Sequence, residues 1–367
     1  FFNIMENLYT ALSISLITDD KRFVIVSDDS NKAIPKFTSM LVNTCSFDTS
    51  QYCVIDLLNV HTTIDLIHQM TNFRDNQYFL KNIIIWQNVQ YLTTNQHKSL
   101  YKLILQIDQF GLRGVRGKPI DIAIGNDEII SINRPQLFTI IMAFDYKAFS
   151  KKLYIYLKEK FWFAVNYNNV EEEDEQESDG LPQDSQYQET ILGFRNSLAD
   201  VFISPDIKGY IYSLIVFTRC HRLASLSPKL TRLPTMAIDY MHDFCKCLAL
   251  WKNQLKLNQE LFITPAYVKL AFRKIGYWLV DWEYNEMFAK DTQSSVLVDD
   301  DSNTLNNEID YQKRLEISML TGDWYGSDYF FVNEYLKSSK SKLDKKSPTG
   351  YTYKIIEDVI SSVRPPL

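Results

Sequence analysis

Residues 22–34 read RFVIVSDDSNKAI, a short apolar run followed by a polar stretch. Val24, Ile25 and Val26 make the run β-branched, which is typical of a strand buried on both faces of a parallel sheet. In such a sheet, the loop after a strand lies at the edge where ligands bind. Residues 22–34 therefore decide the fold and also the place where a site should be sought.

Similar apolar runs alternate with helix-period segments before residue 150. Between residues 94 and 108, Leu100, Leu103, Ile104 and Ile107 recur at helical spacing. This alternation predicts an α/β fold, in which a mainly parallel sheet carries helices on both faces. The predicted strands are 22–26, 52–58, 82–86, 120–124 and 137–144.

The pattern becomes helical after residue 191. Ser204-Pro205 and Thr264-Pro265 each place an N-cap residue before a proline at the first helical position. The predicted helices span 206–222, 234–251 and 266–278. We expect their apolar stripes to form a core rather than a ligand pocket. These stripes include Ile207, Ile211, Leu214, Ile215 and Thr218 in the first helix, and Met236, Ile238, Met241, Phe244, Cys245, Leu248 and Trp251 in the second.

The amino-acid composition limits the classes of protein to which the chain can belong. The 367 residues are 46% hydrophobic and 23% charged, enough for one large or two modest domains and unlike a collagen or a wholly disordered chain. The longest apolar stretch, Leu137–Phe144, is shorter than the roughly 18 residues of a membrane span, so no membrane partner is expected. Five cysteines without paired spacing favour a reducing, intracellular location, cytoplasmic or nuclear. Because the sequence begins at Phe1, we expect that the natural N-terminus precedes it.

Charge is distributed unevenly along the chain. The net charge of -6 arises from 39 basic and 45 acidic residues, and residues 169–191 hold nine of the acids and no Lys or Arg. Such a segment repels itself and buries little, which predicts a flexible acidic linker. The predicted organisation is an α/β core at 1–168, the linker at 169–191, a helical lid at 192–290, a flexible segment at 291–308 and a C-terminal helical segment at 309–367.

The loop Ser27–Ile34 lacks the chemistry of a phosphate loop. Such a loop needs glycines, whose backbone N–H groups wrap the phosphates, followed by Lys and a hydroxyl residue for magnesium. This one has no glycine, places Asp28 and Asp29 where phosphate oxygens would lie, and has Ala33 in place of the hydroxyl. Lys32 alone remains as a weak nucleotide-binding candidate, and a surface role for it is the simpler interpretation.

Two further strand ends bear on nucleotide chemistry. An ATPase sheet presents acidic residues after the strand that corresponds to 82–86, to hold magnesium and activate water. Trp86 and Gln87 occupy this place and can do neither. Asp145 follows the strand at 137–144 and is a weak candidate for sensing a γ-phosphate, or else it caps the next turn.

The segment Gly111–Lys118 joins glycines to three bases, Arg113, Arg116 and Lys118. It could contact a nucleic-acid backbone, but Pro119 and a predicted strand follow it, so the helix-loop-helix setting of a GXXG clamp is absent. A mobile basic hairpin is the alternative. The five histidines lack metal-ligand spacing and no nucleophile motif is present, so we predict no catalytic residue and no metal site.

The order of these features resembles the MoxR and magnesium-chelatase branch of the AAA+ ATPases. That order is a strand, a degenerate phosphate loop, a degenerate acidic strand end, a sensor-like strand and a three-helix unit. Within the branch, several segments are similar to the fungal maintenance of telomere capping protein 2 family, across roughly residues 150–367. These segments are 157–164 (LKEKFWFA), 199–203 (ADVFI), 218–223 (TRCHRL), 325–328 (YGSD) and 363–367 (VRPPL).

The resemblance implies an AAA+-like core with a chelatase-type lid and a role in maintaining telomere capping. The ATPase branch would imply ATP, magnesium and a ring-forming oligomer. The residues on which the ATPase activity of that branch depends are not matched in this chain. Ser30–Ala33 lack the glycines and the hydroxyl of the phosphate loop, and Trp86-Gln87 replace the acidic pair. Arg232 is a weak match to the arginine that senses nucleotide, and another register puts Thr235 there.

We therefore expect a non-catalytic AAA+-like scaffold or interaction protein with protein partners, still unidentified, and no cofactor. One alternative is a working magnesium-chelatase-like ATPase that binds ATP and magnesium through unusual ligands such as Lys32, Asp28 or Asp145. A second alternative is a nucleic-acid-binding module acting through residues 111–118.

Overall fold

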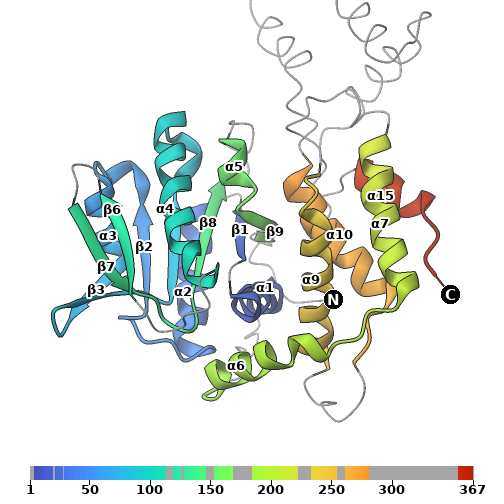
Figure 1. Ribbon diagram of the computed structural model, residues 1–367, viewed down its shortest axis with the longest axis horizontal. Coiled ribbons are helices and arrows are strands. Elements are labelled where there is room, and N and C mark those ends of the chain that lie inside the picture. Colours follow the sequence, from blue (N-terminus) through green and yellow to red (C-terminus); the bar gives the residue numbers. More distant parts are fainter. Residues whose placement is uncertain are drawn as a thin grey trace, which may run out of the picture.

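The computed structural model shows an α/β protein with a helical unit at one side (Figure 1). A five-stranded parallel sheet is flanked by helices and has the strand order β2-β5-β8-β1-β9. The strands are β1 (Arg22–Ser27), β2 (Tyr52–Asp56), β5 (Ile83–Gln87), β8 (Thr139–Asp145) and β9 (Phe161–Tyr167). The structure describes residues 4–19, 21–27, 29–112, 119–124, 128–145, 153–167, 184–221, 233–253, 261–280 and 354–366.

The predicted parallel sheet is confirmed, and its strands differ from the prediction mainly at their ends. Every residue of β1 is buried, as its β-branched run indicates. β2 ends at Asp56 because that side chain caps a 3₁₀ turn, η1 (Leu57–Asn59), by accepting a hydrogen bond from the N–H of Leu58. The sequence pattern did not predict β9, which pairs with β1 on the side opposite β8.

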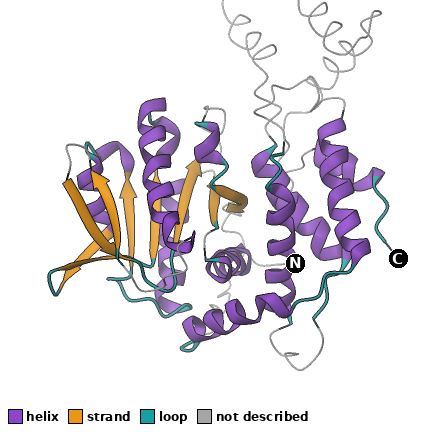
Figure 2. Ribbon diagram, viewed as in Figure 1, coloured by secondary structure: helices purple, strands orange, loops and turns teal. Residues whose placement is uncertain are grey.

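A second sheet of four strands lies beside the first (Figure 2). The predicted strand at 120–124 is confirmed as β6 (Ile120–Ile124), but it belongs to this sheet, where it pairs antiparallel with β7 (Glu128–Asn133). The other two strands, β3 (Thr71–Arg74) and β4 (Gln77–Leu80), form a hairpin. Asp75 and Asn76 form the turn of this hairpin. Both residues have a positive φ, which short polar side chains tolerate.

Helices connect and cover the strands. They are α1 (Ile4–Thr18), α2 (Ser30–Asn43), α3 (Thr63–Met70), α4 (Thr94–Leu112) and α5 (Ile155–Lys158), with a second 3₁₀ turn, η2 (Val89–Tyr91). The four apolar residues predicted to line one face of α4 are all buried. Among the residues that the structure describes, no helix combines the length and apolar character that crossing a membrane requires.

The helical unit contains α6 (Tyr187–Ser197), η5 (Leu198–Asp200), α7 (Pro205–Cys220), α9 (Ala237–Lys252), α10 (Pro265–Leu279) and α15 (Lys354–Ser362). The side chain of Ser204 caps α7 as predicted, at 3.2 Å from the N–H of Ile207, whereas Thr264 makes no side-chain cap at α10. Met236 precedes α9 and is 57% exposed, so its placement in the core is wrong. α6 begins at Tyr187, within the stretch 169–191 predicted as a linker, and residues 169–183 of that stretch lie outside the described residues.

Aromatic side chains join the helical unit to the sheet. Phe244 of α9 packs 4.9 Å from Phe163 of β9, and Trp278 of α10 packs 5.9 Å from Phe144 of β8, measured between ring centroids. The indole N–H of Trp278 donates to the carbonyl of Lys158 at 3.2 Å. Because these rings are buried on both sides of the contact, the helical unit and the sheet share one core.

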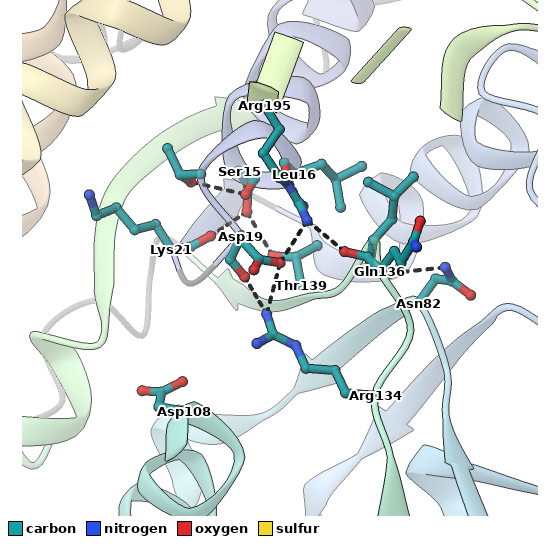
Figure 3. Close-up of polar contacts among 12 residues, drawn as sticks. Ser15, Leu16, Asp19, Lys21, Asn82, Asp108, Arg134, Gln136, Thr139 and Arg195 are labelled. Carbon is teal, nitrogen blue, oxygen red and sulfur yellow. Dashed lines mark hydrogen bonds and ion pairs between the residues drawn. The ribbon is translucent and has the colours of Figure 1, made fainter. Parts of the chain in front are cut away.

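An ionic cluster stands where α1 leads into β1 (Figure 3). The carboxylate of Asp19 accepts ion pairs from Arg134 at 3.2 Å and from Arg195 of α6 at 3.0 Å. Arg195 also donates to the carbonyl of Gln136 at 2.7 Å. The two arginine side chains are 9% and 10% exposed, so their ion pairs with Asp19 form where water solvates charge poorly.

A second ionic cluster surrounds Asp108 of α4. Its carboxylate pairs with Arg22 at the start of β1, and with Lys160 before β9 at 2.9 Å. Burial opposes ionisation of Asp108, but the two cations outweigh it and hold its pKa below the ordinary value. The beginnings of β1 and β9 are thereby tied to α4.

We predict that Asp19→Asn lowers the free energy of unfolding by about 2–4 kcal/mol, because two poorly solvated arginines each lose an ion pair. Asn tolerates the positive φ of 70° at this position, so the backbone is unaffected. Asp75→Asn is the matched control, since Asp75 also has positive φ but lies in an exposed turn. Urea unfolding measures both, and equal stabilities of the two variants would contradict the role of the cluster.

Candidate functional site

The carboxyl ends of β1 and β8 mark the point where the chain changes direction across the sheet. The connection after β1 leads towards β2, whereas the connection after β8 leads across β1 to β9. Ligands of open parallel sheets bind at such a switch point. Ser27 of β1 lies in register with Asp145 of β8, so the backbones of the predicted phosphate loop and sensor position meet here.

The loop after β1 is too short to wrap a phosphate group. β1 ends at Ser27 and α2 begins at Ser30, which leaves two residues between them. A phosphate loop needs a longer glycine-rich turn whose successive N–H groups face the anion. Asp28 lies outside the described residues, and Asp29 is the N-cap of α2.

Asp29 already fills the anion-binding end of α2. Its carboxylate accepts a hydrogen bond from the backbone N–H of Asn31 at 3.0 Å, and its carbonyl accepts from Lys32 and Ala33 at 3.3 and 3.1 Å. The N-terminus of a helix carries partial positive charge and free N–H groups, which are the features that attract phosphate. Here a carboxylate of the chain itself accepts from one of these groups, the N–H of Asn31.

Lys32 does not form part of a built site. Its side chain is exposed in the first turn of α2 and makes no hydrogen bond or ion pair with another described residue. A surface role remains the simpler interpretation of Lys32, and nucleotide binding by its side chain stays a prediction.

The end of β5 carries Trp86, and Asn88 follows the strand. Trp86 is fully buried and packs 6.3 Å from Phe161, so it cannot coordinate a metal. Asn88 adopts the left-handed conformation, with φ of 61°, and its amide donates to the carboxylate of Asp56 at 2.8 Å. The polar atoms after β5 thus serve the neighbouring strand β2, which lies on the side opposite β8.

The described residues at this edge bear on whether magnesium-ATP can bind. They present a capped helix terminus where phosphates would bind, and they include no group of three or more His, Cys, Asp or Glu side chains able to hold a metal. The side chain of Asp145 and residues Arg113, Arg116, Lys118 and Arg232 lie outside what the structure describes, so their nucleotide or nucleic-acid roles stay predictions.

A small cavity opens between α3 and α4, beyond the carboxyl ends of β2 and β5. Its volume is about 110 Å³. Its lining combines buried leucines with exposed polar side chains: Leu57, Leu66, Leu100 and Leu103, together with His61, Thr62, Thr63, Gln96 and Ser99, and also Val60 and Leu92. Pockets for small-molecule ligands are typically roughly 300–1,000 Å³, so this one is too small for a nucleotide.

Neither this cavity nor the Asp29 cap was predicted from the sequence. An N-cap aspartate is a recognisable signal, but Pro35 inside α2 obscured the start of that helix. The cavity unites residues from two loops and two helices, and no local pattern predicts their contact.

Comparisons with known proteins give distant matches. No protein-family model matches the sequence. "Maintenance of telomere capping protein 2" of Saccharomyces cerevisiae strains RM11-1a and AWRI1631 is 23% identical over 237 residues, which cover 59% of this chain and 56% of those proteins. The chain thus matches little more than half the length of these curated relatives.

Two solved structures match this chain at low similarity. A proposed ATPase from Cytophaga hutchinsonii ATCC 33406 is 12% identical, with a TM-score of 0.49 over 84% of this chain and 92% of its own. A full-length MCM homologue from Methanopyrus kandleri is 9% identical, with a TM-score of 0.46 over 75% of this chain and 55% of its own. At these identities, site residues cannot be transferred from either structure.

We predict that Asp29→Ala lowers the free energy of unfolding by about 1 kcal/mol, because α2 loses its N-cap, whereas Asp29→Ser retains most of the stability. Chemical denaturation at neutral pH measures both variants. If Asp29→Ala is as stable as the parent, the carboxylate does not cap the helix and is available to a ligand.

Proposed function

We propose that the protein is a non-catalytic AAA+-like scaffold or interaction protein that contributes to the maintenance of telomere capping. The observation that carries the proposal is the Asp29 cap on α2, because it puts a carboxylate where a nucleotide phosphate would bind. The link to telomere capping rests on the curated relatives and is a proposal for this chain.

The rigid attachment of the helical unit supports the same proposal. Enzymes that use a lid open and close it during turnover. Here the aromatic rings of α9 and α10 are buried against β8 and β9, and the indole of Trp251 also donates to Thr10 of α1 at 3.2 Å. Such an arrangement favours a fixed surface for partners over a moving lid.

The alternative, a magnesium-chelatase-like ATPase, requires anion binding at α2. It would have to displace Asp29 and recruit Lys32. The side chain of Lys32 is exposed and forms no ion pair with an acidic residue that the structure describes. We therefore expect no cofactor. Partner proteins, self-association and an intracellular location, cytoplasmic or nuclear, are part of the proposal.

We predict that purified protein neither binds nor hydrolyses magnesium-ATP. A ligand at 100 times its Kd stabilises a fold by about 2.7 kcal/mol, so even weak binding would raise the unfolding temperature measurably. The unfolding temperature in millimolar magnesium-ATP should equal that of the nucleotide-free protein. Calorimetric titration with magnesium-ATP should show no saturable heat of binding.

The variant Lys32→Ala distinguishes the scaffold proposal from the ATPase alternative. The scaffold proposal predicts that it changes neither the unfolding temperature nor phosphate release, as for the neighbouring exposed control Lys36→Ala. Micromolar binding with turnover that Lys32→Ala abolishes, but Lys36→Ala spares, would establish the ATPase instead.

A further inference from the structure

The exposed face of α2 carries positive charge. Lys32, Lys36, Ser39 and Asn43 recur at helical spacing and are all exposed, so they form one row along the helix, named here the α2 stripe. The helix, all of which the structure describes, contains no Asp or Glu. The side chains of the stripe end in two ammonium groups, a hydroxyl and an amide, which all donate hydrogen bonds. The stripe therefore suits a ligand rich in carboxylates.

Neither lysine of the α2 stripe forms an ion pair within the part of the chain that the structure describes. The adjoining carboxylate of Asp29 accepts from the backbone N–H of Asn31 instead. The amide of Asn43 donates to the hydroxyl of Ser39 at 3.0 Å, which is a contact within the stripe. The ammonium groups of Lys32 and Lys36 are thus available to carboxylates from elsewhere.

The acidic segment of residues 168–183 is attached at both ends of α2. Tyr167, the last residue of β9, lies in register with Ser27 at the end of β1, and α2 begins after two further residues. On the other side of the segment, the N–H of Asp184 donates to the carbonyl of Thr44, the C-cap of α2, at 3.0 Å. The described chain therefore breaks off near the start of α2 and resumes beside its end.

The segment has the length needed to follow α2. The 14 residues of the helix span about 21 Å at 1.5 Å per residue. A flexible chain of about 16 residues has a root-mean-square end-to-end distance of about 20–24 Å, and repulsion between like charges extends it further. Residues 168–183 can therefore run beside the α2 stripe over its whole length.

We propose that residues 168–183 lie along the α2 stripe, with carboxylates of residues 171–179 paired with Lys32 and Lys36. Residues 171–179 read EEEDEQESD, and the whole segment contains no Lys or Arg. A single exposed ion pair stabilises little, but here several carboxylates are available to each ammonium group. Because the segment is tethered at both ends, its effective concentration at the stripe is on the order of millimolar.

This inference goes beyond the scaffold role. It gives the α2 stripe a ligand within the same chain, so an acidic partner or a phosphate group reaches Lys32 only in competition with that ligand. It does not depend on whether magnesium-ATP binds, because the stripe and the segment do not include the Asp29 cap. The nucleotide titrations can therefore fail while the segment still lies on α2, and the reverse is also true.

The first test applies a zero-length carbodiimide cross-linker to the unmodified full chain at low salt. The reagent joins an amine to a carboxylate only where the two are in contact, and products are read from the monomeric fraction. We expect cross-links from Lys32 or Lys36 to residues 171–179, more abundant than those from the exposed control Lys102 of α4. They should be lost in roughly 1 M salt, where the Debye length falls to about 3 Å. Cross-links that are absent, or no more abundant than those from Lys102, overturn the proposal.

The second test asks whether the stripe is already occupied. In a neutralised variant, every Glu of residues 171–179 becomes Gln and every Asp becomes Asn, so that the tethered segment cannot compete. A fluorescein-labelled peptide of residues 168–183 should bind this variant with saturable anisotropy. For a peptide Kd of about 0.1 mM, the unmodified chain should bind it about tenfold more weakly, because its own segment is present at about 1 mM. Equal affinities, or no binding to the neutralised variant, overturn the proposal.

Matched substitutions in the neutralised variant test whether the peptide binds α2. Lys32→Gln combined with Lys36→Gln should abolish saturable binding, because both cations of the stripe are lost. Lys98→Gln combined with Lys102→Gln removes the same charge from exposed positions of α4 and should leave the affinity unchanged. Equal affinities of the two double variants contradict the assignment to α2.

Discussion

The carboxylate of Asp29 and the N-terminus of α2 form the interaction on which the functional account depends. A helix N-terminus offers a few N–H groups and a partial positive charge, and one anion satisfies them. Asp29 is attached to the helix that it caps, so a phosphate group would compete with an anion held in place at no translational cost. Only two residues connect the buried strand β1 to α2, which is shorter than the glycine-rich turn of a phosphate loop.

The surrounding structure is built for rigidity. Ionic clusters around Asp19 and Asp108 tie the beginnings of the strands to α4 and α6, while aromatic rings fuse α9 and α10 to the other side of the sheet. Charged and apolar contacts thus fix the same few strands from two directions. A scaffold benefits from such fixation, because a pre-organised surface loses little entropy when a partner binds.

Local sequence pattern predicted the parts of the fold that local physics determines. The β-branched runs of β1, β5 and β8 and the helical spacing in α4 were sufficient, because burial dictates their composition. The end of β2 was misjudged because Asp56 caps a turn that apolar character alone does not disclose. The strand β9 is aromatic rather than β-branched, and its place beside β1 depends on a long-range pairing.

Little of the candidate site could be predicted from the sequence. The missing glycines and the Trp86-Gln87 pair predict lost phosphate chemistry, which stays a prediction, whereas the role of Asp29 as a cap required the geometry of the turn. The cluster of Asp19 with Arg134 and Arg195 joins residues more than 100 positions apart, and no spacing rule relates them.

The backbone amide of Asn31 reports most directly on the central claim, because it donates to Asp29 in the capped helix and would face a phosphate in a working site. Amide NMR spectra of the deuterated full chain, recorded with and without magnesium-ATP, would follow it. The account predicts that the resonances of Asn31, Lys32 and Ala33 stay in place at millimolar nucleotide. Saturable shifts of these three amides would contradict it.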